Sequence, residues 1–73
     1  MDLDWCQFVA RHCAARGVAY TLVVVRMART ESYQLARAAF YSRAGDAEIR
    51  ELLNAALMEC GGNDAALAHR DGR

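Results

Sequence analysis

Three stretches of the chain carry clear patterns of apolar and polar positions. In the first, apolar side chains recur at helical spacing at Trp5, Val9 and Cys13, and the opposite face is mostly polar. Acidic residues near its start suit the positive end of a helix dipole, and Gly17 can take the positive φ that often ends a helix. We therefore expect a first helix over residues 3–16.

The second stretch, residues 20–27, reads YTLVVVRM and is rich in β-branched side chains. Such side chains are restricted at χ1 in a helix but pack well on a pleated sheet. The composition predicts a buried β-strand over residues 18–27. Because the strand is apolar at both alternating sets of positions, each of its faces needs a covering layer.

The third stretch is amphipathic at helical spacing, with Ile49, Leu53 and Leu57 on one face. Asp46 is a candidate N-cap, and the glycines at positions 61 and 62 end the pattern. The sequence thus predicts a last helix over residues 46–60. We expect residues 1–60 to form a single domain and residues 61–73 to form a flexible C-terminal tail.

Residues 33–41 allow two interpretations. Their helix propensity is high, and Thr30 and Gly45 are candidates to begin and end a helix there. As a strand, the same segment would pair with residues 18–27 through a loop of residues 28–32, which closes the backbone hydrogen bonds within one chain. The hairpin is slightly favoured, because no other segment of the chain offers the first strand a partner.

The favoured fold class is therefore α+β, a small α-β-β-α domain with a two-stranded antiparallel hairpin packed against two helices. The alternative is an α-β-α-α chain whose single strand pairs with that of a second copy across a dimer axis. A chain of 73 residues builds only a small core, and small scaffolds often gain stability from a second copy. A homodimer is thus expected.

In the hairpin, two helices cover one face of the sheet and leave the other face apolar. An uncovered apolar face of this kind is a docking surface for another protein. Arginines in the same part of the chain either solvate that face or pair with carboxylates or phosphates of a partner. The candidate partner-binding residues are Val23, Val25, Met27, Tyr33, Leu35, Tyr41, Arg26, Arg29, Arg37 and Arg43.

Charge narrows the class of partner. The formal net charge is zero, which argues against bulk attraction to nucleic acid or to an anionic membrane. The middle of the chain is basic, and the predicted last helix is acidic. No apolar run approaches the ~18 residues that span a bilayer. We therefore favour a protein partner over nucleic acid and expect no membrane partner.

No set of residues suggests catalysis, a metal or a cofactor. Cys6 and Cys13 are two helical turns apart, roughly 10 Å, which is too far for a disulfide. No closely spaced pair of cysteines or histidines starts a zinc site, and His12 points to a different helix face from Cys13. Without a catalytic set, the protein is expected to be non-enzymatic. Three thiols without a pairing pattern, and a start without a basic signal region, predict a cytoplasmic location.

The alternative layout of strand, helix and helix over residues 20–60 resembles the ribbon-helix-helix DNA-binding proteins. The run Ile49-Arg50-Glu51 is similar to the start of that family's second helix. The resemblance implies a homodimeric DNA-binding regulator that lays a paired strand in the major groove.

The favoured layout, with the small size and the Arg-rich composition, resembles small orphan accessory proteins of bacteriophages and prophages, among them anti-CRISPR proteins. The resemblance is one of size, composition and layout, and it transfers no site residue. It implies a protein-binding accessory or inhibitor that blocks a host defence complex such as a CRISPR effector.

Overall fold

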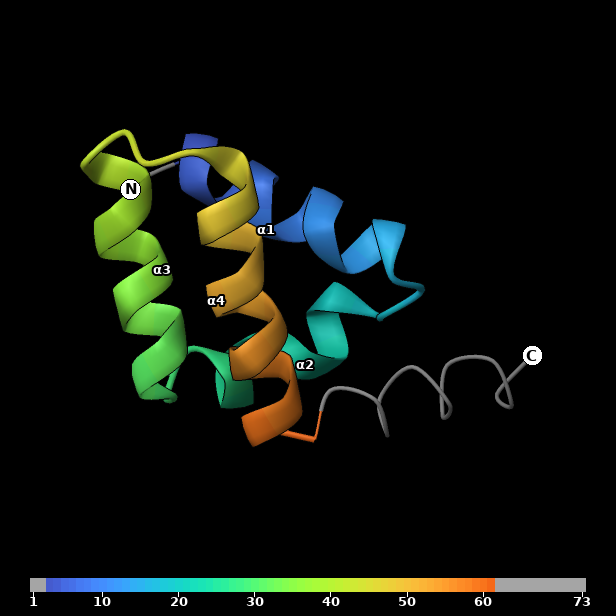
Figure 1. Cartoon of the computed structure of the whole chain (residues 1–73). Coiled ribbons are helices and arrows are strands. Elements are labelled where there is room, and N and C mark those ends of the chain that lie inside the picture. The colour runs from blue at the N-terminus through green and yellow to red at the C-terminus, as the bar shows by residue number, and fades with distance from the viewer. Residues whose placement is uncertain (1–2, 62–73) are drawn as a thin grey trace.

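The computed structural model describes residues 3–61 and places four α-helices in that range (Figure 1). They are α1 (Leu3–Ala15), α2 (Tyr20–Met27), α3 (Glu31–Tyr41) and α4 (Asp46–Glu59). The predicted first and last helices are confirmed, each ending one residue earlier than expected. The flexible tail expected for residues 61–73 lies outside the described residues, apart from Gly61.

The α+β prediction is wrong, because the segment expected to form the strand is helix α2 and no strand occurs among residues 3–61. Both predicted layouts, the α-β-β-α hairpin and the α-β-α-α alternative, required that strand. Residues 33–41 lie in α3, so the helical interpretation of this segment is confirmed and the strand interpretation is wrong. The ribbon on which the ribbon-helix-helix resemblance rested is therefore absent from this part of the chain.

Packing and backbone hydrogen bonding explain why α2 is a helix despite its β-branched side chains. Val23 and Met27 lie one helical turn apart and are fully buried, whereas Val25 between them is 63 % exposed. With helices on both sides of it in the sequence, the segment has no strand to pair with, so its backbone must bond internally. The helix penalty of a valine is only about 0.5 kcal/mol, against about 1.5–3 kcal/mol for each buried side chain.

The four helices enclose one core. α3 and α4 run antiparallel side by side (Figure 1), and α1 and α2 contact α4 and each other. Every helix contributes side chains to the interior. The buried apolar residues are Trp5, Val9, Cys13, Val18, Val23, Met27, Tyr33, Ala36, Ile49, Leu53, Ala56 and Leu57.

Two helices end in the same backbone arrangement. A residue with positive φ follows the helix, and its amide and the next amide donate hydrogen bonds to carbonyls of the last turn. After α1 this residue is Gly17, with φ of 70°, as the sequence predicts; its amide and that of Val18 donate to carbonyls of the last turn at 3.1 and 2.8 Å. After α3 the residue is Arg43, with φ of 63°, and not Gly45. The amides of Arg43 and Ala44 donate backwards at 3.1 and 3.0 Å.

Of the two predicted N-caps, one is confirmed and one is wrong. Thr30 caps α3 as expected: its Oγ1 accepts from the Tyr33 amide at 3.1 Å and donates to the Met27 carbonyl at 2.8 Å. One side chain thus ties the end of α2 to the start of α3. The prediction for Asp46 is wrong, because Gly45 occupies the N-cap of α4 and Asp46 is the first helical residue. Its carboxylate still lies at the positive end of that helix.

Candidate functional site

The residues predicted to line one sheet face are divided between the core and the surface. Val23, Met27 and Tyr33 are buried, so they hold the helices together instead of facing a partner. Val25, Leu35 and Tyr41 are exposed. The sheet face that was to unite all six does not exist in an all-helical domain.

The exposed apolar residues of α3 do not form one surface either. Leu35 and Tyr41 are six residues apart, which places them about 120° apart around the helix axis. The Arg37 guanidinium lies over the Tyr41 ring, 5.5 Å from its centroid, so this arginine and this tyrosine form a local pair. Arg43 is exposed in the turn that follows α3.

A coherent surface is present on α2. Leu22 and Val25 are 56 % and 63 % exposed and lie one turn apart on the side of the helix that faces away from the core. Arg26 and Arg29 are exposed on the next turn, and the Arg29 amide donates to the Arg26 carbonyl at 3.2 Å, continuing the helical path. We call Leu22, Val25, Arg26 and Arg29 the α2 outer face. Sequence reasoning missed Leu22, which a helical reading of residues 20–27 would have placed beside Val25.

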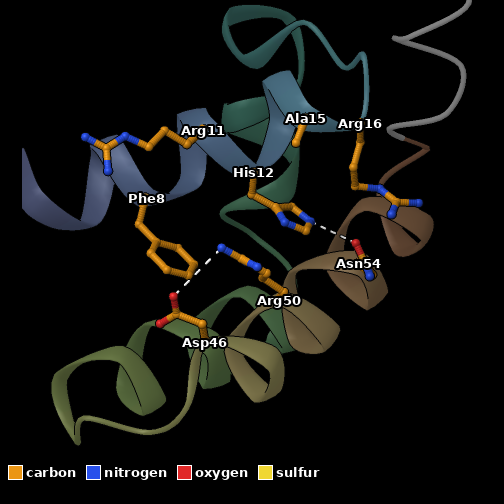
Figure 2. Close-up of a pocket in the computed structure, with 8 residues that line it drawn as sticks. All are labelled: Phe8, Arg11, His12, Ala15, Arg16, Asp46, Arg50 and Asn54. Carbon is orange, nitrogen blue, oxygen red and sulfur yellow. Dashed lines mark hydrogen bonds and ion pairs between the residues drawn. The ribbon is translucent and has the colours of Figure 1, made fainter.

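A second surface feature is a groove of about 520 Å³ between α1 and α4. Figure 2 shows that side chains from both helices line it, with His12 and Asn54 in its depth. We call this feature the arginine groove, because three arginines and only one carboxylate line it. The lining residues are Phe8, Arg11, His12, Ala15, Arg16, Asp46, Arg50 and Asn54.

A hydrogen bond joins the two walls of the arginine groove. The His12 Nε2 atom lies 2.8 Å from the Asn54 Oδ1 atom, and with the nitrogen as donor this bond fixes the tautomer of the neutral imidazole (Figure 2). Burial lowers the pKa of His12 below its usual 6.5, and the positive charges of Arg16 and Arg50 lower it further, against the opposing effect of the Asn54 bond. The imidazole is therefore mainly neutral at pH 7.

The charged side chains at the rim of the groove are loosely held. Arg50 and Asp46, one turn apart on α4, approach to 3.8 Å, and both side chains are mostly exposed. An exposed ion pair of this kind contributes only about 0.3–0.5 kcal/mol. Sequence reasoning did not find this groove, since the convergence of α1 and α4 depends on tertiary packing and leaves no signal in local spacing.

The three thiols differ in burial, and none of them is in a disulfide. Cys13 is buried, and burial together with the nearby Cys60 thiol raises the pKa of Cys13 to about 11. A thiol in that state is protonated at neutral pH and is a weak nucleophile. Cys6 and Cys60 are partly buried and unpaired.

Among residues 3–61, no three His, Cys, Asp or Glu side chains are grouped so that they could hold a metal ion. Within the same range no single helix has the length and apolar character needed to cross a membrane; α1 and α2 meet that criterion only together, with a bend of 119° between them.

Comparisons of the chain with protein-family models, with curated proteins and with solved structures found no match. The α2 outer face and the arginine groove are therefore the features on which a functional assignment rests.

Proposed function

We propose that this protein is a non-enzymatic binding protein that docks onto a partner protein through the α2 outer face. The observation that supports this proposal is the exposure of Leu22 and Val25, two large apolar side chains on adjacent turns of one helix, at 56 % and 63 %. Apolar side chains gathered on one helix face are the usual anchor of a helix that packs on another protein.

The arginines beside Leu22 and Val25 indicate the chemistry of the partner surface. Arg26 and Arg29 follow Val25 on the same side, and α2 itself contains no acidic residue. Arginine suits interface rims because its guanidinium binds carboxylates in a planar, two-pronged geometry. The partner surface is accordingly an apolar patch with carboxylates on one side of it.

Other exposed apolar side chains do not offer a comparable patch. Leu3 and Met58 are each the one large exposed hydrophobic that the described part of its helix carries, on α1 and α4 respectively. Isolated exposed apolar residues are normal on soluble proteins and need no partner to explain them. Met58, at 74 % exposure, therefore serves as a matched control for Val25.

The proposal keeps the protein-binding role expected from the sequence and changes its surface. A host defence complex as the partner was implied by a resemblance of layout, and that layout is wrong; the acidic and apolar character of the partner is what the α2 outer face supports. The proposal includes a cytoplasmic location, in keeping with three unpaired thiols in the described chain. Residues 20–27 are helical, so they do not form the paired strand that the alternative mode of DNA binding requires.

The test is a capture experiment with a quantitative second stage. Wild type, Val25→Asp and Met58→Asp are immobilised, and each is exposed to lysate of the source organism. A protein retained by wild type and Met58→Asp but not by Val25→Asp is then purified, and its affinity for all three is measured by calorimetry at two salt concentrations. We expect Val25→Asp to weaken binding at least about tenfold, as loss of an interface anchor does, and added salt to weaken wild-type binding.

Circular dichroism of each variant shows whether the fold is retained. The proposal fails if folded Val25→Asp binds the purified partner as tightly as wild type. It also fails if wild type captures nothing that the Val25→Asp variant does not. Sedimentation of wild type alone identifies self-association, and a dimer that Val25→Asp dissociates would make a second copy the partner.

A further inference from the structure

We propose that the arginine groove between α1 and α4 binds a nucleotide, with its phosphates on the arginines and its base against Phe8. The inference is independent of the α2 outer face, because none of the four residues of that face lines the groove. It assigns to the protein a small-molecule site in addition to its protein-binding surface.

The arrangement of charge supports an anionic ligand. Arg11 of α1, Arg16 of the turn that follows α1 and Arg50 of α4 line the groove, whereas Asp46 is the one carboxylate in the lining. This is a local excess of positive charge on a chain whose formal net charge is zero. The positive charges of Arg16 and Arg50 both lower the pKa of His12, and Figure 2 shows the two side chains on either side of the His12–Asn54 bond. Several guanidinium groups around one cavity are suited to the oxygens of a phosphate.

The present partner of Arg50 is easily displaced. Its contact with Asp46 is 3.8 Å long and lies among exposed side chains, so it contributes little to stability. A phosphate carries more charge than a carboxylate and offers three oxygens, so it competes well for the same guanidinium. Binding would then exchange a weak surface pair for charge-assisted hydrogen bonds.

The depth of the groove is uncharged at neutral pH, and a hydrogen bond crosses it. His12 is 8 % exposed, and its bond to Asn54 ties α1 to α4. A neutral imidazole here avoids burying a further positive charge, and a fixed floor reduces the ordering cost when a ligand enters.

Phe8 distinguishes a nucleotide from a simple phosphate ion. Its ring stacks on Trp5 at 6.1 Å between centroids and meets Phe40 at 5.4 Å, so neighbouring rings hold it in place. Figure 2 shows the same ring at the end of the groove near Arg50 and Asp46. Stacking of a base on an aromatic side chain contributes about 1–3 kcal/mol in known nucleic-acid sites. The volume of about 520 Å³ is within the usual range of small-molecule pockets.

The experiment is an NMR titration of ¹⁵N-labelled protein with ATP, inorganic phosphate and an acidic peptide as separate probes. We expect ATP at millimolar concentration to shift amide signals of residues lining the groove on α1 and α4, and phosphate to bind more weakly at the same sites. Arg16→Gln and Arg50→Gln should each weaken ATP binding about tenfold, the effect of losing a charge-assisted contact. Arg37→Gln, which removes an exposed arginine on α3, should leave the affinity unchanged.

Several results would overturn the proposal. They are no shift with ATP, equal weakening by Arg37→Gln and Arg50→Gln, or binding of the acidic peptide as tight as that of ATP. Phosphate binding as tight as ATP binding would refute the role of Phe8 and with it the nucleotide. The spectrum of each variant without ligand reports its fold, and Arg50→Lys, which keeps the charge, should recover part of the affinity if the groove acts through electrostatics.

Discussion

The indole nitrogen of Trp5 lies 2.9 Å from the phenol oxygen of Tyr33, across 28 residues of sequence and inside the core. The two rings meet edge to face, with 5.5 Å between their centroids. Trp5 sits in the first turns of α1 and Tyr33 in the first turn of α3, beside the Thr30 cap. One contact therefore fixes α1 against the paired helices α3 and α4.

Removing only the phenol oxygen isolates the hydrogen bond in that contact. We expect Tyr33→Phe to lower the free energy of unfolding by about 1 kcal/mol, the usual net value of a buried hydrogen bond. Tyr33→Leu should cost about 2–4 kcal/mol, because it also removes the ring from the aromatic cluster. Urea denaturation of both variants measures the two contributions. Equal stability of Tyr33→Phe and wild type would show that the indole gains nothing from this acceptor.

Val23 and Val25 give the most direct test of the fold. In a strand the two would share a face, whereas in α2 Val23 is fully buried and Val25 is 63 % exposed. We expect Val23→Ala to lower the free energy of unfolding by about 2 kcal/mol and Val25→Ala to change it by less than about 0.5 kcal/mol. Thermal and urea denaturation check this difference. Similar losses for both variants would contradict a helix at residues 20–27.

The sequence allowed α1 and α4 to be predicted because their signals are local and agree with one another. Each has an apolar stripe at helical spacing and a glycine near its end. Residues 20–27 could not be assigned in this way, because four consecutive apolar residues, Leu22 to Val25, hide any periodicity. The β-branched composition then favours a strand, and this strand in turn makes residues 33–41 the expected second strand of a hairpin. Helical packing of Val23 and Met27 against the core overrode that local preference.

The candidate surfaces were predictable only in part. The exposure of Val25 and of Arg26 and Arg29 agrees with a role at the surface. Leu22 was overlooked because in a strand it would lie on the opposite face from Val23 and Val25. The arginine groove depends on the approach of α1 to α4, where the His12 Nε2 atom lies 2.8 Å from the Asn54 Oδ1 atom. Residues 42 positions apart meet only once the helices pack, and no spacing rule within one helix reveals this.

Reciprocal substitutions at the two turn residues with positive φ are expected to change the free energy of unfolding in opposite directions. Gly17 has φ of 70°, and a Cβ there would meet nothing within 4 Å, so Gly17→Ala tests backbone strain alone. We expect it to lower the free energy of unfolding by about 1 kcal/mol. Arg43 already bears that strain at φ of 63°. Arg43→Gly should relieve it and raise the free energy of unfolding by about 0.5–1 kcal/mol, part of the gain being offset by a more flexible unfolded chain.

Arg43→Ala is the control for that pair of variants. It removes the charge and length of the arginine but keeps a Cβ at the left-handed position, so its stability should stay near that of wild type. Melting temperatures of the three variants and of wild type provide the comparison. A stability gain in Arg43→Ala equal to that in Arg43→Gly would mean that the arginine side chain, and not the backbone, is the source of strain.

The lowered pKa of His12 makes the free energy of unfolding depend on pH. Its pKa in the folded protein is below the usual 6.5, chiefly through burial, so the unfolded chain binds a proton more readily than the folded one. The contribution of His12 to stability is therefore fully present above pH 6.5 and falls as the pH drops from there to the folded pKa, by at most about 1.4 kcal/mol per pH unit. The charged groups that line the groove around it are Arg11, Arg16, Arg50 and Asp46.

Urea denaturation of wild type and His12→Gln between neutral and mildly acidic pH tests this pH dependence, since the contributions of all other groups cancel in the difference. We expect the wild type to lose stability more steeply than the variant, whatever the stability of the variant at neutral pH. Identical slopes would show that the imidazole titrates alike in the folded and unfolded chains.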